Sequence, residues 1–167
     1  MENNHIDDDS TIYVVGIGNE YRRDDGIGIH IARKLKKLNL PNLQITDNIK
    51  DAIELIELWK NKKYVIVIDA VSSASDPGMI YRFDASKKQL PAKYFRHSTH
   101  NFSVAEAVEL SKKLKSLPSR LIIYGIEGKD FSEGVDLSDE IQKVAEYVLD
   151  LILQEAKPLL QPLNHSN

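Results

Sequence analysis

The chain has 167 residues, of which 42% are hydrophobic and 28% are charged, a composition typical of an ordinary globular protein. Its formal net charge of −3 argues against nucleic acid or an anionic membrane surface as a partner. The chain contains no cysteine, which excludes disulfides, thiolate metal ligands and a cysteine nucleophile. Any metal ion bound by its side chains must therefore be held by nitrogen and oxygen atoms.

No apolar run in the sequence approaches the roughly 20 residues that a membrane-spanning helix needs. The first ten residues, MENNHIDDDS, are acidic and polar, the opposite of a secretory signal, so a cytoplasmic location is expected. Residues 1–10 and 159–167 are interpreted as loose tails on either side of one domain, residues 11–158. A chain of this length can bury about 70% of its unfolded surface.

Apolar runs alternate with helical patterns along this domain. Strands are predicted at residues 11–18, 43–46, 64–70, 79–83 and 120–126. Apolar residues spaced three or four apart predict helices from Ile27 to Leu38, from Ala52 to Trp59, after Ser103, and from Leu137 to Ile152. Strands separated by helices indicate a layered α/β domain with a mainly parallel sheet.

Two of the predicted helices begin with capping signals. Asp51 and Glu54 form an acidic version of the capping box, and Ser103 and Glu106 form an S-x-x-E box. An N-cap of this kind stabilises the following helix by about 1 kcal/mol.

The stretch VVGIGNEYRRDDGIG, residues 14–28, joins the first strand to the first helix through a glycine loop. Such loops commonly hold a phosphate at a helix N-terminus, but Asp24 and Asp25 at this helix entrance would repel one. One of the two acids can cap the helix while the other points toward the end of the sheet. The spacing alone does not say which acid does which.

A third acid, Asp69, ends the apolar run VIVID. Because ligands of parallel sheets bind outside the carboxyl ends of the strands, residues 18–25 and 69–78 are expected to lie together. An alternative is that Asp69 only accepts hydrogen bonds from loop N–H groups. His100, in HSTHNFSV, precedes a helix that a right-handed crossover can bring to the same end of the sheet. His97, three residues earlier, could be a ligand, an orienting group or an exposed side chain.

If Asp25, Asp69 and His100 converge, two carboxylates and one imidazole form a site for a divalent transition metal, with positions open to substrate. A cation would also relieve the repulsion between two nearby carboxylates. A serine–histidine hydrolase that uses Ser72 or Ser73 is an alternative. The sequence contains neither a P-loop nor the H-E-x-x-H and G-x-S-x-G motifs.

Three blocks, VVGIGNEYRRDDGIGIHIARKL, VIVIDAVSSASDPGMIYRF and STHNFSVAEAVEL, resemble those of hydrogenase maturation proteases in order and spacing. Members of that family are endopeptidases that trim the C-terminal extension of the large subunit of nickel–iron hydrogenases. The resemblance implies a three-layer α/β/α fold of the phosphorylase/hydrolase-like kind. Its sheet would have five strands, mostly parallel, with one antiparallel strand.

The resemblance also assigns the metal-binding and catalytic roles to Asp25, Asp69 and His100, whereas His97 matches no ligand of the family. Nickel would be carried by the hydrogenase large-subunit precursor and would act as the recognition signal, and other divalent cations could substitute for it. Asn19 and Gly26 match the family pattern as loop-forming residues. A monomer is expected, because a large precursor must dock on the open end of the sheet.

One departure from the family pattern follows the second strand. Many members have an acid and a Gly-Gly-Thr turn there, whereas this chain has Asp47 and then Asn48-Ile49-Lys50. This region is interpreted as a place where the substrate tail is read, so the departure bears on the identity of the partner. Two alternative functions remain open: a non-catalytic chaperone that binds nickel or the precursor, and a generic metal-dependent hydrolase of a small molecule such as a phosphoester.

Overall fold

The computed structural model describes residues 10–94 and 103–160. Its strands are β1 (Ile12–Gly16), β2 (Leu43–Thr46), β3 (Tyr64–Val71), β4 (Ile80–Asp84) and β5 (Arg120–Glu127). Its α-helices are α1 (Ile27–Lys37), α2 (Ala52–Trp59), α3 (Val104–Leu114) and α4 (Asp139–Leu160). Two short 3-10 helices are η1 (Arg23–Gly26) and η2 (Ala92–Tyr94).

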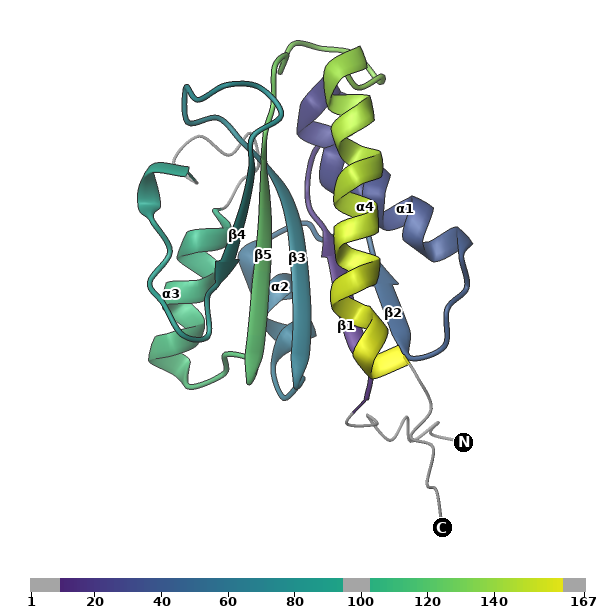
Figure 1. Ribbon diagram of the computed structural model, residues 1–167. Coiled ribbons are helices and arrows are strands. Elements are labelled where there is room, and N and C mark those ends of the chain that lie inside the picture. The colour runs from purple at the N-terminus through teal and green to yellow at the C-terminus, as the bar shows by residue number, and fades with distance from the viewer. Residues whose placement is uncertain (1–9, 95–102, 161–167) are drawn as a thin grey trace.

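The five strands form a mixed sheet in the order β2-β1-β3-β5-β4. β1 pairs in parallel with β2 and β3, and β3 pairs in parallel with β5. β4 is an edge strand and runs antiparallel to β5. Helices α1 and α4 cover one face of the sheet, and α2 and α3 cover the other (Figure 1). The α/β fold and its five-stranded sheet with one antiparallel strand are therefore confirmed.

Side chains alternate between the two faces of β3, the central strand, all of whose residues are buried. Ile66 and Ile68 point into the core under α1 and α4. Val67 and Val71 point into the core under α2 and α3. Burial on both faces is the reason that this strand has a continuous apolar sequence.

Of the two predicted capping boxes, the one at α3 forms completely and the one at α2 forms only in part. At α2 the Asp51 side chain accepts a hydrogen bond from the Glu54 N–H (2.8 Å). The Glu54 carboxylate accepts one from the N–H of Lys50 (2.7 Å), the residue before the N-cap. At α3 the reciprocal box of Ser103 and Glu106 is complete. These caps fix where α2 and α3 begin.

Helix α4 extends to Leu160, past the domain boundary expected at residue 158, with Pro158 inside its last turn. Near that end Glu155 accepts hydrogen bonds from the hydroxyl groups of Tyr64 (2.8 Å) and Tyr124 (2.6 Å), which fastens the helix to the sheet. Within the described part of the chain, no helix is both long enough and apolar enough to cross a membrane.

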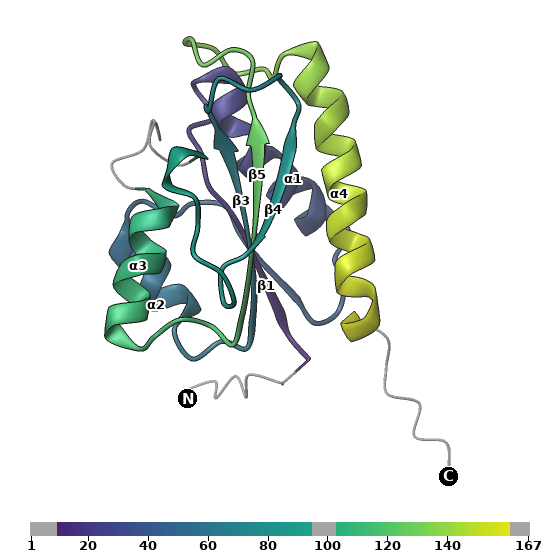
Figure 2. The same ribbon diagram turned by 60° about the vertical axis from the view of Figure 1, so that its left-hand side comes forward.

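The loops that follow β1, β3 and β5 gather at the end of the sheet formed by the carboxyl ends of these three strands, the upper end in Figure 2. We call this end of the sheet its carboxyl end. It is the place where an α/β fold builds its ligand sites.

Candidate active site

Two glycines bring the start of α1 into close contact with the strand ends. A Cβ atom on Gly28 would lie 2.3 Å from the carbonyl oxygens of both Ile17 and Ile68, so no larger residue fits without a shift of backbone. Gly18 has a φ of +153°, and a Cβ there would lie 2.1 Å from the carbonyl oxygen of Asp25. The residues around Asp25 are therefore packed beside Ile68, the residue that precedes Asp69.

Asp25 lies in η1 with 2% of its surface exposed. Its Oδ2 atom accepts a hydrogen bond from the N–H of Asn19 (3.0 Å). The Asn19 side chain in turn accepts one from the N–H of Tyr21 (3.0 Å), which closes a tight turn. Asn19 thus shapes the loop that holds Asp25, as expected of a loop-forming residue.

Asp24, the neighbouring acid, has a different environment. It is fully buried, and its carboxylate accepts hydrogen bonds from the N–H groups of Lys129, Asp130 and Ser138 and from the Ser138 hydroxyl, at 2.7–2.9 Å. Neither acid caps α1, whose N-cap is Gly26 without a side-chain hydrogen bond. Asp24 instead fastens the first loop to the loop after β5.

Asp69 is also 2% exposed and lies near the end of β3, opposite Gly125 of β5. It alternates with Val67 and Val71, so its side chain is directed to the face covered by α2 and α3. Helix α3 leads into β5, which is parallel to β3. The N-terminus of α3 at Val104 accordingly points toward the carboxyl end of the sheet, on the same face as Asp69.

His100 and His97 lie outside the described residues, so the structure does not place them. Over residues 10–94 and 103–160, no three His, Asp or Glu side chains are grouped closely enough to hold a metal ion. The structure brings Asp25 and Asp69 to one end of the sheet, and the assignment of His100 stays a prediction.

Arg22 and Arg23, the basic pair of this loop, both bind the loop after β5. The Arg22 guanidinium donates to the carbonyl oxygen of Phe131 (3.0 and 3.2 Å), and Arg23 forms an ion pair with Asp130 (3.3 Å). These contacts hold the first loop against the loop after β5. They also engage the two guanidinium groups that a phosphate ligand would need.

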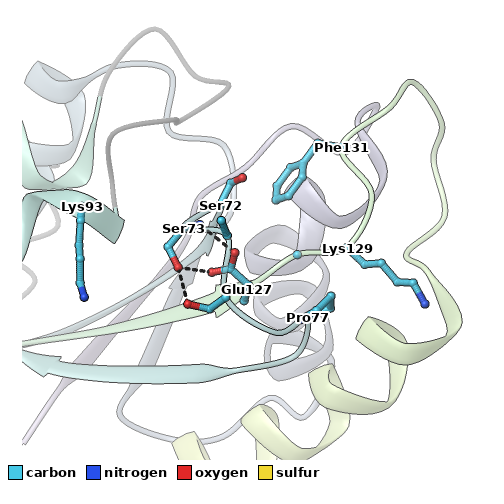
Figure 3. A pocket seen from close by; sticks show the side chains of 10 residues that line it. Ser72, Ser73, Pro77, Lys93, Glu127, Lys129 and Phe131 are labelled. Carbon is cyan, nitrogen blue, oxygen red and sulfur yellow. Dashed lines mark hydrogen bonds between the residues drawn. The ribbon is translucent and has the colours of Figure 1, made fainter.

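A cavity of about 600 Å³ opens beside this site at the carboxyl ends of β3 and β5 (Figure 3). Glu127, the last residue of β5, lines it and is 2% exposed. Its carboxylate accepts hydrogen bonds from the N–H (2.8 Å) and the hydroxyl (2.7 Å) of Ser73. The Ser73 hydroxyl also shares a hydrogen bond with that of Ser75 (3.0 Å), and the serine–histidine alternative gains no support from these contacts.

Glu127 was not among the residues predicted to have a function. A signal for it is present in the sequence, because the run RLIIYGIE ends in an acid, as VIVID does. An acid at the carboxyl end of a buried parallel strand lies where ligands bind.

The fold and the site define a three-layer α/β protein with buried acids at the carboxyl end of its sheet. The sequence model of the hydrogenase maturation protease family matches residues 29–155, a span that includes Asp69 and begins after Asp25. The chain belongs to the hydrogenase maturation protease family and is accordingly a peptidase.

Relatives of this family cover most of the chain. A Methanocaldococcus jannaschii protein assigned to hydrogenase maturation proteases is 32% identical over 87% of this chain and 96% of its own length. The hydrogenase 2 maturation protease of Escherichia coli is 26% identical over 85% of this chain and 88% of its own.

Solved structures share the fold. An endopeptidase from Escherichia coli superposes with a TM-score of 0.77 at 23% identity, covering 89% of this chain and 93% of that one. The hydrogenase maturating endopeptidase HybD from the same organism gives a TM-score of 0.70 at 21% identity, with the same coverage.

Proposed function

We propose that this protein is the endopeptidase that removes the C-terminal extension of a nickel–iron hydrogenase large-subunit precursor after nickel insertion. Nickel in this reaction belongs to the substrate. Asp25, Asp69 and His100 bind it from the open side of the site and so recognise a precursor that is ready to be cut.

The observation that carries this proposal is the position of the two acids. Asp25 and Asp69 are both 2% exposed, and the Gly28–Ile68 contact holds their chain segments against each other. Buried carboxylates repel each other, and a shared cation removes that repulsion. His100 precedes α3 by a few residues, and the N-terminus of α3 points toward the carboxyl end of the sheet on the same face as Asp69.

The donor set suits a transient contact with nickel. Imidazole and carboxylate bind divalent transition metals, whereas a thiolate would compete with thiolate ligands of the substrate for the ion. The peptide bond is then cut by water. Either the nickel ion polarises the carbonyl group or acidifies a bound water, or the carboxylate of Asp25 or Asp69 takes the proton from water as a general base.

The test is a cleavage assay with a nickel-loaded precursor, read by the mass of the large subunit. Asp25→Asn, Asp69→Asn and His100→Ala should abolish cleavage while the circular dichroism spectrum and the melting temperature stay close to wild type. Asp139→Asn, which removes an exposed carboxylate from the start of α4, is the matched control and should cleave normally. Cleavage at the wild-type rate by His100→Ala would refute the site assignment.

The same assay separates the two alternatives. A chaperone would bind the nickel-loaded precursor without changing its mass. A phosphoester hydrolase is disfavoured because Arg22 and Arg23 are engaged with Phe131 and Asp130. A cytoplasmic location and a monomeric state remain predictions, and light scattering of the purified protein would test the second.

A further inference from the structure

Two large apolar side chains project from the loops beside the proposed active site. Val135 is 68% exposed and Tyr21 is 67% exposed, the highest values among the large apolar side chains of residues 10–94 and 103–160. Tyr21 belongs to the loop after β1 and Val135 to the loop after β5, at the carboxyl end of the sheet (Figure 2). Both line one groove of about 360 Å³. Single exposed apolar residues are common on protein surfaces, whereas apolar residues gathered at one place mark an interaction site.

The backbone that carries these two side chains is firmly held. The N–H of Tyr21 donates to the Asn19 side chain (3.0 Å), and its carbonyl oxygen accepts from the Gly134 N–H (3.0 Å). The carbonyl oxygen of Gly134 accepts from the Arg23 N–H (3.0 Å), so the two loops form a short parallel bridge next to Val135. An aromatic side chain on a backbone fixed in this way loses little conformational freedom when a partner covers it.

The groove has the composition of a surface that binds another protein. Tyr21 and Val135 supply its apolar surface, and Asn19, Arg22 and Glu133 add polar groups to the same lining. Apolar contacts combined with a polar rim are typical of protein interfaces. Tyrosine is among the residue types that contribute most to the binding energy of such interfaces.

The position of the groove indicates which partner covers it. Asn19 lines the groove, and its N–H donates to Oδ2 of Asp25 (3.0 Å). A single residue thus separates the groove from one of the acids proposed to bind nickel. A precursor whose nickel ion reaches Asp25 must therefore lie over this groove.

Exposure distinguishes the part of the precursor that lies here from the segment that is cut. Asp25 and Asp69 are 2% exposed, so the cut segment has to enter a recess to reach them. Tyr21 and Val135 project outward instead, and projecting side chains suit a folded surface whose hollows receive them. A specific complex buries about 800 Å² of each partner, so the surface around the site contributes as well as the site itself.

We propose that Tyr21 and Val135 form a docking surface for the folded body of the large-subunit precursor, where they contact apolar side chains outside the segment that is cut. The inference rests on the proposed function and adds the surface by which the protein holds its partner. Neither side chain takes part in breaking the peptide bond, so both contribute to substrate binding.

The first test measures cleavage of a nickel-loaded precursor by wild type, Tyr21→Ala and Val135→Ala. Loss of an aromatic anchor weakens a protein interface strongly, so Tyr21→Ala should raise KM by about tenfold, with kcat within about twofold of wild type. Val135→Ala should raise KM by about threefold, because it removes less apolar surface. Tyr21→Phe removes only the hydroxyl group and should keep the KM of wild type.

Tyr147→Ala is the matched control, because it removes a tyrosine that is 59% exposed on α4. It should have the KM of wild type. The melting temperatures of all these variants should stay within about 2 °C of wild type, since the replaced side chains are exposed.

The second test uses the processed large subunit, which lacks the extension, as an inhibitor. It should compete with the precursor for wild type, and Tyr21→Ala should weaken this inhibition by the same factor by which it raises KM. An unchanged KM in Tyr21→Ala, or a raised KM with unchanged inhibition by the processed subunit, would overturn the inference. A lowered melting temperature with a loss of kcat would overturn it too, by assigning Tyr21 a structural role.

Failure of the proposed function would be seen separately, as the inability of wild type to cut any precursor. Calorimetric binding of the processed subunit to wild type and to Tyr21→Ala would then decide on the docking surface by itself. Binding that is about tenfold weaker in Tyr21→Ala would support the docking surface, and equal binding would overturn it.

Discussion

Asp24 and Ser138 are joined by two hydrogen bonds although 114 residues separate them in the chain. The Asp24 carboxylate accepts from the Ser138 N–H (2.7 Å) and from the Ser138 hydroxyl (2.9 Å). This contact ties the loop that carries Asp25 to the residue that precedes α4. The contact gives Asp24 a structural role that its neighbour Asp25 does not share.

Replacement of Asp24 should affect stability, and replacement of Asp25 should affect activity. Asp24→Ala leaves buried N–H groups without acceptors and should lower the free energy of unfolding by about 3 kcal/mol. Asp25→Asn keeps an acceptor for the Asn19 N–H and should change it by less than about 1 kcal/mol, while cleavage is lost. Urea unfolding and the cleavage assay give both quantities. Equal stability of the two variants would contradict the structural role of Asp24.

The close contact of Gly28 with Ile17 and Ile68 predicts a large effect of one added methyl group. In Gly28→Ala the new Cβ would meet two backbone carbonyl oxygens at 2.3 Å, which forces α1 away from the sheet. We expect a loss of about 2–4 kcal/mol in the free energy of unfolding and reduced cleavage, because η1 and Asp25 move with the helix. Gly134→Ala, in the loop after β5, cannot serve as the control, because Gly134 has a φ of +152° and alanine would be strained there as well.

A suitable control is Ala105→Gly, near the start of α3, which should cost about 1 kcal/mol through helix propensity. A Gly28→Ala variant as stable as wild type would show that the contact between α1 and the strand ends has room for a methyl group.

Glu155 predicts a pH dependence of stability. Burial raises the pKa of its carboxyl group, but hydrogen bonds from Arg82, Tyr124 and Tyr64 outweigh burial and hold the pKa below the ordinary value of 4.5. Its folded pKa is lower than its unfolded pKa, so the stabilisation is fully present above about pH 4.5 and is lost as the pH falls through the folded value.

The variant Glu155→Gln removes the charge that this dependence needs. It should be less stable than wild type by about 2 kcal/mol at pH 7 and should lose less stability between pH 5 and pH 3. Thermal unfolding across this pH range is the measurement. Parallel pH profiles of the two proteins would refute the assignment of acid sensitivity to Glu155.

The turn after β2 should influence which precursor is accepted. Asn48 and Lys50 are exposed, whereas Ile49 packs against the core under α2 and α3. Asp47 is bound by Arg33 (2.7 Å), whose guanidinium also binds Glu20 of the first loop (2.6 Å), so this turn is linked to the loop of Asp25. Substitution of residues 48–50 by Gly-Gly-Thr should change the KM for different precursors by several-fold.

Competition between two precursors in one reaction measures this preference directly. The stability cost should stay near 1 kcal/mol, because Ile49 is only partly buried. An unchanged preference would remove this turn from the substrate-binding surface.

Much of the fold followed from periodicity. Continuous apolar runs such as 64–70 predicted buried parallel strands, since a strand covered on both faces has no polar position to reveal its pleat. The capping residues Asp51 and Ser103 marked helix starts because their side chains act on backbone only a few residues away. These features depend on local geometry, which a short stretch of sequence specifies.

The sequence by itself determined the layered α/β class and the candidate acids, the Asp24–Asp25 pair at a helix entrance and Asp69 at a strand end, because these residue types and positions are local. Only the tertiary structure decided that Asp24 anchors the loop after β5, and that Glu127 lines a cavity with Ser73 on the face of the sheet to which Asp69 is directed. Those roles depend on strand register and on contacts between residues far apart in the chain. Such contacts exist only after the sheet has assembled, and no spacing along the chain encodes them individually.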